Sequence, residues 1–488
     1  MTANKSDIIY LLMGVVVAAG GAVVIGNPDT RVGLFVVAGM LAAGLVMAIY
    51  IKPSLGADVL IIAVFTNISR TFTDRGLPSV IKPLVFIVAI AIFVRYLNAA
   101  RPPGGRARTR GIESYLFFFF IMTAVSYLAA SDKDLAIEAI LDLGKDIVII
   151  YCIMFTLRHP NTWKQSAWTV ILITAFLCLL GAYQVVSGNY DQTFFGLARV
   201  VEDVGSSSTT YRISGPINEP NIWGQVVVAV VPLVIIRVIY ERRLRMKLVS
   251  LGILGILLFE VLNSYSRGAY LALAVILVLV LVGHRPHPLV WLGSAAAVVF
   301  ILPFLPASYM ERFESLLLLS PANDGGIYQE ASFRGRTSEM LTGLNMFVKN
   351  PLLGVGAGNY PNNYQEYTEE LGLELRTGER DPHSLYVQIL AETGLVGMIS
   401  FLGFSILLLV NLSRARQSIE HMVAYKGWAS WISAIQLTII GYLITSFFLH
   451  GSYLRFFWIF VALALAAIQL TEESLINPDQ NHSLELSV

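Results

Sequence analysis

The sequence predicts an all-α, polytopic membrane protein: a bundle of about twelve to fourteen transmembrane helices with one large, partly helical loop on the outer side. Hydrophobic residues make up 56% of the 488 residues and charged residues only 14%, which is more apolar surface than a soluble core can bury. The apolar residues also fall into runs of about twenty, the length that crosses a hydrocarbon core of about 30 Å. The net charge of +1 gives no reason to expect a nucleic-acid partner.

The apolar runs follow one another from the N-terminus onward. The first leads directly into the second without a small-residue cleavage site, so we expect a retained helix and not a signal peptide. The runs at 55–69 and 146–158 are short, and either could be a re-entrant segment covered by its neighbours. The predicted spans are 8–26, 33–51, 55–69, 78–97, 112–130, 146–158, 165–187, 222–240, 246–263, 267–283, 289–306, 384–411, 428–447 and 456–470.

Lys and Arg collect in alternate connections, which predicts the side on which each connection lies. With a cytoplasmic N-terminus, basic loops such as 95–110 and 241–247 face the cytoplasm. The connections on the other side include two long ones, 188–221 and 307–382. Long loops in a compact membrane domain are usually functional or carry their own small fold. Within the second, the apolar spacing of 337–348 predicts a helix along the membrane surface.

Four arginines lie in or beside the outward-facing segments, where arginine is uncommon. A charge at the headgroup level is costly unless it is paired or faces a water-filled cavity. Each arginine could reach lipid phosphates or pair with a local carboxylate. Several guanidinium groups that converge would instead bind a diphosphate through paired hydrogen bonds. The four are Arg212, Arg267, Arg336 and Arg455.

A histidine stands at the start of the apolar run "DPHSLYVQILAETGLVG" (381–397). Asp381 is a suitable N-cap and Pro382 suits the first helical position, which predicts that His383 lies in the first turn. The positive end of the helix dipole disfavours an imidazolium there, so we expect a neutral histidine that can accept a proton. A purely structural role at the membrane interface is the alternative.

A carboxylate follows nine residues later in the same run. In an unbroken helix Glu392 lies about 180° around from His383, so we interpret Glu392 as structural unless Gly394 and Gly397 break the helix. The glycines of "PLLGVGAGNY" (351–360) follow no predicted strand, so we expect tight turns there and no nucleotide site.

Four segments in this order resemble the O-antigen ligase and O-antigen polymerase superfamily of bacterial envelope glycosyltransferases. The likeness covers roughly residues 210 to 410, and Ser384 stands where many relatives have Asn. The segments are "RISGPINEPNIWGQ" (212–225), "SYSRGAYLAL" (264–273), "GRTSEMLTGLNMFVKNPLLGVGAGNY" (335–360) and "DPHSLYVQILAETGLVG" (381–397).

The resemblance implies a multi-pass protein of the bacterial inner membrane whose active site faces the periplasm. The implied donor is a glycan on undecaprenyl diphosphate, and no metal or other cofactor is expected. His383 matches the family histidine proposed to activate the acceptor hydroxyl. Arg212, Arg267 and Arg336 match arginines that hold the diphosphate; Arg455 matches no motif and is included for its charge alone.

We therefore expect an N-terminal transmembrane bundle (1–187), a catalytic transmembrane region (188–470) that contains the loop 307–383, and a polar cytoplasmic tail (471–488). The expected reaction is a single, inverting displacement. The acceptor stays open: lipid A-core for a ligase, a growing glycan for an O-antigen or exopolysaccharide polymerase, or a protein for an O-oligosaccharyltransferase. A non-enzymatic transporter or flippase of anionic lipid-linked glycans is the alternative from another class.

Overall fold

The structure is a computed structural model, and it describes residues 30–97, 111–204, 209–284, 331–373, 380–422, 425–450 and 455–476. Helices dominate this part of the chain, which confirms the predicted fold class. A two-stranded antiparallel sheet, in which Arg212 of one strand is paired with Val201 of the other, is the one departure there from an all-helical fold.

The elements alternate in direction along most of the chain. The first half contains α2 (Thr30–Ile51), α3 (Ser54–Phe65), α4 (Ile68–Thr73), α5 (Ile81–Leu97), α6 (Ile112–Val125), η1 (Ser126–Ala129), α7 (Lys133–Thr156), α8 (Pro160–Ser187), η2 (Phe194–Gly196), β1 (Val200–Val204) and β2 (Thr209–Ile213). The second half contains α9 (Pro220–Tyr240), α10 (Leu244–Asn263), α11 (Arg267–His284), α14 (Ala331–Lys349), α15 (Tyr360–Glu370), α16 (Leu385–Glu420), α17 (Lys426–Thr445) and α18 (Arg455–Ile476).

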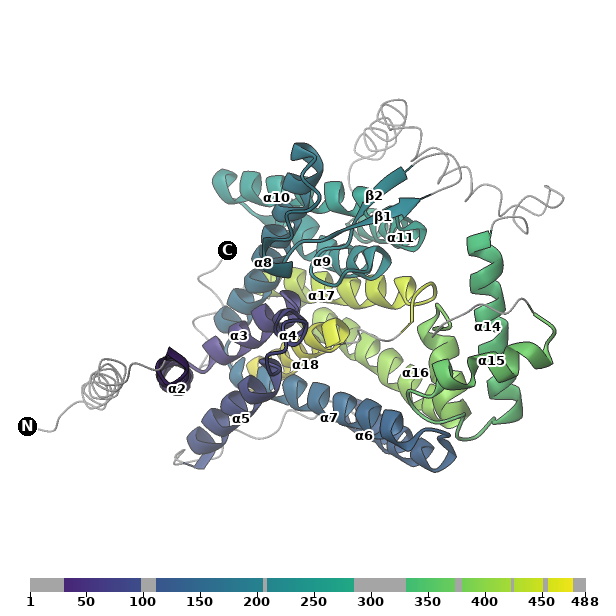
Figure 1. Cartoon of the computed structure of the whole chain (residues 1–488). Coiled ribbons are helices and arrows are strands. Elements are labelled where there is room, and N and C mark those ends of the chain that lie inside the picture. The colour runs from purple at the N-terminus through teal and green to yellow at the C-terminus, as the bar shows by residue number, and fades with distance from the viewer. Residues whose placement is uncertain are drawn as a thin grey trace, which may run out of the picture.

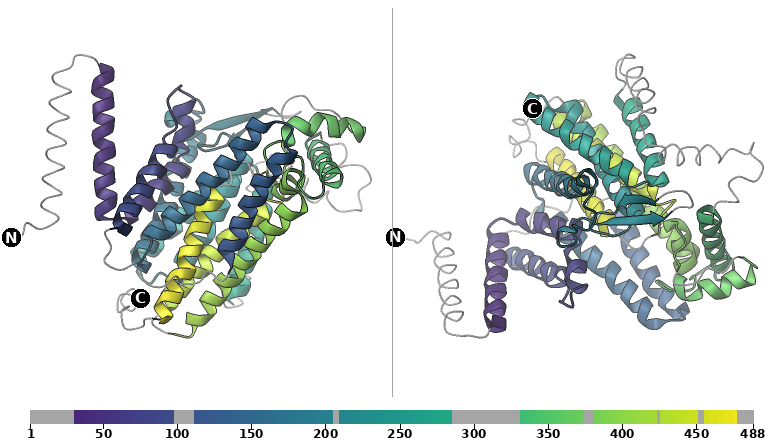
Figure 2. Two further views of the ribbon diagram at one scale, coloured as in Figure 1. Left: turned by 90° about the horizontal axis from the view of Figure 1, so that it is seen from below. Right: turned by 45° about the horizontal axis from the view of Figure 1, so that its top comes forward.

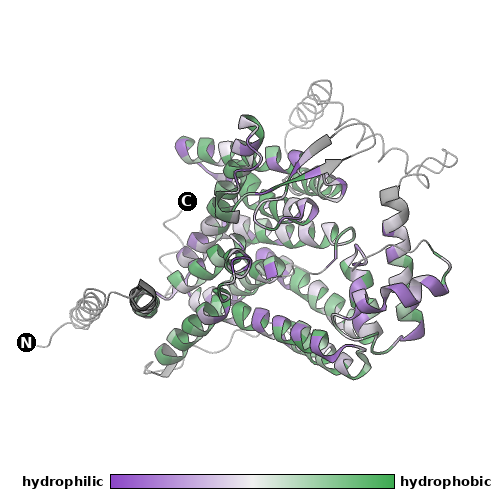
Figure 3. Cartoon of the chain, in the orientation of Figure 1, coloured by the Kyte–Doolittle hydropathy of each residue, from purple (hydrophilic) through white to green (hydrophobic). Residues whose placement is uncertain are grey.

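The long helices lie side by side, and α14 and α15 sit at the end of the bundle where α16 begins (Figures 1 and 2). We call this end of the bundle the α16 start. The helices of the bundle are largely apolar, whereas α14 and α15 carry many hydrophilic residues (Figure 3). The inner helices are α9 and α18, whose apolar residues are buried on all sides. One hydrophobic core joins residues of α3, α8, α9, α17 and α18.

Seven helices of the described part are long and apolar enough to cross a membrane, and four further apolar helices are shorter. A polytopic membrane protein is the class of protein that this composition and helix set describe. The seven are the unit formed by α6 and η1, together with α8, α9, α10, α16, α17 and α18. The predicted spans 8–26 and 289–306 lie outside the described residues.

The two short predicted spans differ in the structure from their predicted bounds. The run at 55–69 is divided into α3 and α4 because Asn67 between them adopts a left-handed backbone with φ of 47°. The run at 146–158 is only the second half of α7, which begins at Lys133. Asp132 is the N-cap and accepts hydrogen bonds from the amides of Asp134 (2.9 Å) and Leu135 (3.1 Å). Charged residues in the first half of α7 had concealed this part of the helix from a search for apolar runs.

Candidate functional site

The turn that carries His383 precedes α16, so the predicted place of this histidine in the first helical turn is wrong. The helix begins at Leu385 with Ser384 as N-cap, and His383 has a left-handed backbone with φ of 45°. The first amide of the helix, that of Leu385, donates to the carbonyl of Ser446 at the end of α17 (3.0 Å). Tertiary contact with α17 therefore fixes where α16 starts, and Asp381 does not cap the helix.

A buried carboxylate lies beside the histidine. His383 Nε2 is 3.3 Å from Oε2 of Glu339 on α14; the Glu339 side chain is 1% exposed and the His383 side chain 31%. Such a carboxylate stabilises the imidazolium that forms when the ring takes up a proton, and it orients the ring. The pair therefore has the composition of a general base with a fixed partner.

Close packing of two helices makes this pair possible. Gly343 stands one turn after Glu339 on α14, where a Cβ atom would lie 2.5 Å from Cγ1 of Val387 in the first turn of α16. A glycine at this position lets α14 approach α16, and residues four apart share a helix face. Glu339 thus reaches the turn before α16, where His383 lies.

The side chain of Glu339 was not singled out from the sequence. The pattern that could have indicated it is the i, i+3, i+7 series Glu339, Thr342 and Met346, all buried, in which the first member is charged. A charged residue in the buried stripe of an amphipathic helix needs a partner. The partner, however, lies 44 residues away along the chain and could not be identified from spacing.

A second histidine lies next to the first. The rings of His383 and His450 are 5.9 Å apart between centroids and nearly edge-on, and His450 Nδ1 is 3.8 Å from Oδ2 of Asp381. His450 comes from the segment after α17. It ties the turn 380–384 to that segment, in addition to the bond from Leu385 to Ser446.

Two of the predicted arginines flank one turn, 264–267. Arg212 on β2 donates from Nε to the carbonyl of Ser264 (3.0 Å) and from Nη2 to Oδ1 of Asn221 (2.9 Å). Arg267 is the first residue of α11 and directly follows this turn. The next residue, Gly268, packs on Phe448, which lies two residues before His450. The segment 446–450 therefore touches both the arginine turn and the histidine turn.

The other two arginines have different surroundings. Arg336 lies three residues before Glu339 on α14, and the two therefore share a side of that helix. Arg455, at the start of α18, has its Nη2 3.9 Å from Oδ2 of Asp142 on α7. This contact is the local carboxylate pairing considered as the alternative for each arginine. Convergence of the four on one diphosphate stays a prediction.

The phenol of Tyr360 supports α14 from α15. Its hydroxyl donates to the backbone carbonyl of Glu339 (2.5 Å), and its side chain is fully buried. Burial, with the nearby charge of Glu339, raises the pKa of Tyr360 well above its usual range. The phenol therefore stays protonated and remains a donor at any physiological pH.

Comparison with known proteins agrees with this site. Residues 252–402 match the sequence model of a family described as O-antigen ligase, and this range contains Arg267, Arg336, Glu339 and His383. The chain is also 22% identical over 384 residues to the teichuronic acid biosynthesis protein TuaE of Bacillus subtilis (strain 168), which covers 76% of this chain and 74% of that protein. The chain is therefore a glycan-processing membrane enzyme of the O-antigen ligase superfamily, with the family domain at residues 252–402.

Proposed function

We propose that this protein is a glycosyltransferase that moves a glycan from undecaprenyl diphosphate to an acceptor hydroxyl at the periplasmic face of the inner membrane. The observation that carries the proposal is the contact of His383 with buried Glu339, within the range matched by the O-antigen ligase family. An imidazole with a fixed carboxylate suits the removal of a proton from a hydroxyl. A transporter of anionic lipids needs cationic groups but no such base.

The reaction is a single displacement. His383 accepts the proton of the acceptor hydroxyl as its oxygen forms a bond to the anomeric carbon. The bond from that carbon to the diphosphate oxygen breaks, and undecaprenyl diphosphate leaves with the bonding electron pair. Arg212 and Arg267, which flank one turn, are placed to balance the developing negative charge. Attack opposite the leaving group inverts the anomeric centre.

Two acceptor classes have support from different sources. The matched family is described as O-antigen ligase, which favours transfer of a finished glycan to lipid A-core. The relative named for teichuronic acid biosynthesis favours a second candidate, polymerisation of glycan repeat units. A single addition product indicates a ligase, and a ladder of products indicates a polymerase.

The test is a transfer assay with the purified protein in nanodiscs, undecaprenyl-diphosphate glycan and a panel of acceptors. We expect His383→Ala to lower turnover by a factor of about 10² or more, the range for loss of a general base. We expect Arg267→Ala to weaken donor binding and to lower turnover by about 10² or more. Full activity of His383→Ala would exclude the base, and unchanged donor binding and turnover in Arg267→Ala would remove that arginine from the diphosphate site.

A further inference from the structure

Glu392 lies at a break in α16. Its side chain is buried, and two residues later Gly394 leaves the helical conformation, with φ of 66° and ψ of −166°. Before the break, the carbonyls of Ala391 and Glu392 accept hydrogen bonds from outside the helix. The break therefore opens α16 to another segment of the chain, which the sequence had suggested only as a possibility.

The segment that enters the break is 351–360. The amide of Val355 donates to the carbonyl of Ala391 (2.8 Å), and the amide of Gly356 donates to the carbonyl of Glu392 (3.1 Å). At Gly354 a Cβ atom would stand 2.4 Å from the carbonyl oxygen of Ala391. The glycines of this segment thus let two backbones lie in direct contact, deep beside a membrane-spanning helix.

The carboxylate of Glu392 lies at the N-terminus of α15. It accepts hydrogen bonds from the amide of Tyr360, the first residue of α15 (3.4 Å), from Nε2 of Gln388 (3.3 Å) and from the backbone of Gly358. A helix N-terminus presents free amides and a partial positive charge, which together stabilise an anion. A carboxylate within a membrane helix therefore has a helix end as its counter-charge, in place of an arginine.

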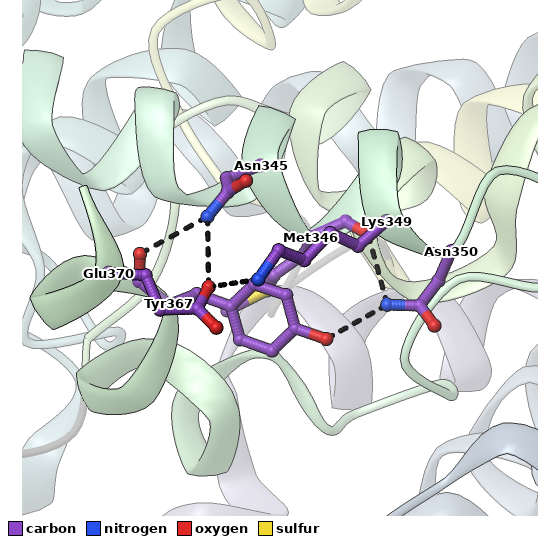
Figure 4. Close-up of polar contacts among 6 residues, drawn as sticks. All are labelled: Asn345, Met346, Lys349, Asn350, Tyr367 and Glu370. Carbon is purple, nitrogen blue, oxygen red and sulfur yellow. Dashed lines mark hydrogen bonds and ion pairs between the residues drawn. The ribbon is translucent and has the colours of Figure 1, made fainter.

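From the start of α15 a short series of contacts leads to the base. Tyr360, whose amide contacts Glu392, donates from its hydroxyl to the carbonyl of Glu339, whose carboxylate contacts His383. Polar contacts along the same helix pair keep α14 and α15 together: the amide of Asn345 and the carbonyl of Tyr367 are 3.3 Å apart, and the amide of Asn350 and the Tyr367 hydroxyl are 2.9 Å apart (Figure 4). The two helices therefore move as one unit.

We propose that Glu392 is a positioning residue: by holding the N-terminus of α15 in the break of α16, it keeps the buried charge of Glu339 against His383. The inference rests on the proposed function, since it assigns Glu392 a task in the reaction that His383 performs. Glu392 and His383 are on the same segment, so the loop between them is closed through α15 and α14. A shift of about 1 Å in such a support can lower turnover by about 10².

The test compares Glu392→Gln and Tyr360→Phe with the wild type in the transfer assay, using full-length protein in nanodiscs. Glu392→Gln keeps the shape of the side chain and removes its charge; Tyr360→Phe removes one hydroxyl. Glu366→Gln, an exposed change on α15, is the matched control and should behave as the wild type. We expect kcat to fall about tenfold or more in Glu392→Gln and several-fold in Tyr360→Phe, with the KM for the donor unchanged within a factor of two.

The pH profile distinguishes positioning from a general loss of structure. The negative charge of Glu339 stabilises the imidazolium of His383, and only the neutral ring accepts a proton. When Glu339 moves away, the ring loses its proton at lower pH, so the acid limb of the kcat profile should shift to lower pH in both variants. A wild-type kcat, or a lowered kcat with an unmoved acid limb, would overturn the proposal. If Glu392→Gln does not fold, Tyr360→Phe alone decides by the same criterion.

Failure of this inference can be told from failure of the proposed function. If His383→Ala retains full activity, the base assignment is wrong whatever the Glu392 variants do. If His383→Ala is inactive while Glu392→Gln and Tyr360→Phe keep the wild-type kcat and profile, the glycosyltransferase proposal stands and only the positioning role is lost.

Discussion

His383 has a backbone conformation that most side chains avoid. A non-glycine residue in the left-handed region costs on the order of 1 kcal/mol, and such residues persist only where their surroundings fix them. Here the fixing contacts are those of Leu385 with Ser446 and of Asp381 with His450. Strain of this kind is common at functional sites, and it places the imidazole outside the helix, toward Glu339.

The partner of this histidine gives the prediction at the residue scale. Glu339→Gln keeps the volume of the side chain and removes the charge that stabilises the imidazolium. We expect kcat to fall about tenfold or more and the acid limb of the kcat profile to move to lower pH, because the neutral ring then persists in more acidic solution. Glu370→Gln, an exposed change on α15, should leave the profile unchanged. An unmoved acid limb in Glu339→Gln would separate Glu339 from the base.

At the scale of elements, the break in α16 depends on glycine. Gly394 adopts a combination of φ and ψ that is essentially restricted to glycine, and a Cβ atom there would stand 2.3 Å from the carbonyl oxygen of Leu352. The helix therefore cannot close without expelling the segment 351–360. An apolar run with two glycines did not by itself distinguish a continuous helix from a broken one.

Gly394→Ala should accordingly destabilise the protein more than a glycine substitution that meets no neighbour. Gly372→Ala is the matched control, since Gly372 also has a positive φ, of 63°, but open space around it. We expect a cost of about 1 kcal/mol for Gly372→Ala and about 3 kcal/mol or more for Gly394→Ala, which adds a backbone clash. Thermal unfolding in detergent measures both. Equal Tm values for the two variants would contradict the close approach at the break.

At the scale of the whole molecule, the two ends of the bundle differ in charge. The connections at the end opposite the α16 start carry basic residues such as Arg242 and Arg243, whereas the α16 start carries the histidine turn and α15. By the positive-inside rule the basic end faces the cytoplasm. The active site would then face the periplasm, where a lipid-linked glycan already flipped across the membrane is available.

Labelling of introduced cysteines tests this orientation. The two natural cysteines, Cys152 and Cys178, are buried, so a membrane-impermeant maleimide should report introduced residues only. We expect Gln365→Cys on α15 to be labelled in intact spheroplasts and Arg242→Cys only after the membrane is permeabilised; both positions are exposed. Labelling in the reverse order would place the α16 start in the cytoplasm and exclude a periplasmic reaction.

The division into an N-terminal bundle (1–187) and a catalytic region (188–470) stays a prediction about function. In the fold the two ranges pack together: the indole of Trp163 on α8 donates to the carbonyl of Leu463 on α18 (2.7 Å), and both helices contribute to one core. If the N-terminal helices have no part in the reaction, their task is to support α9 and α18.

The sequence by itself determined the class of protein, most of the helices and the candidate base, because apolar run length, charge placement and local residue types are properties of short segments. It did not determine the contacts of His383, the break that receives the segment 351–360, or the task of Glu392. Glu339 and His383 are 44 residues apart, and the start of α16 depends on a carbonyl 61 residues away. Such pairs are selected by helix packing, in which Gly343, Gly354 and Gly394 permit contacts that no local pattern encodes, and only the tertiary structure decided them.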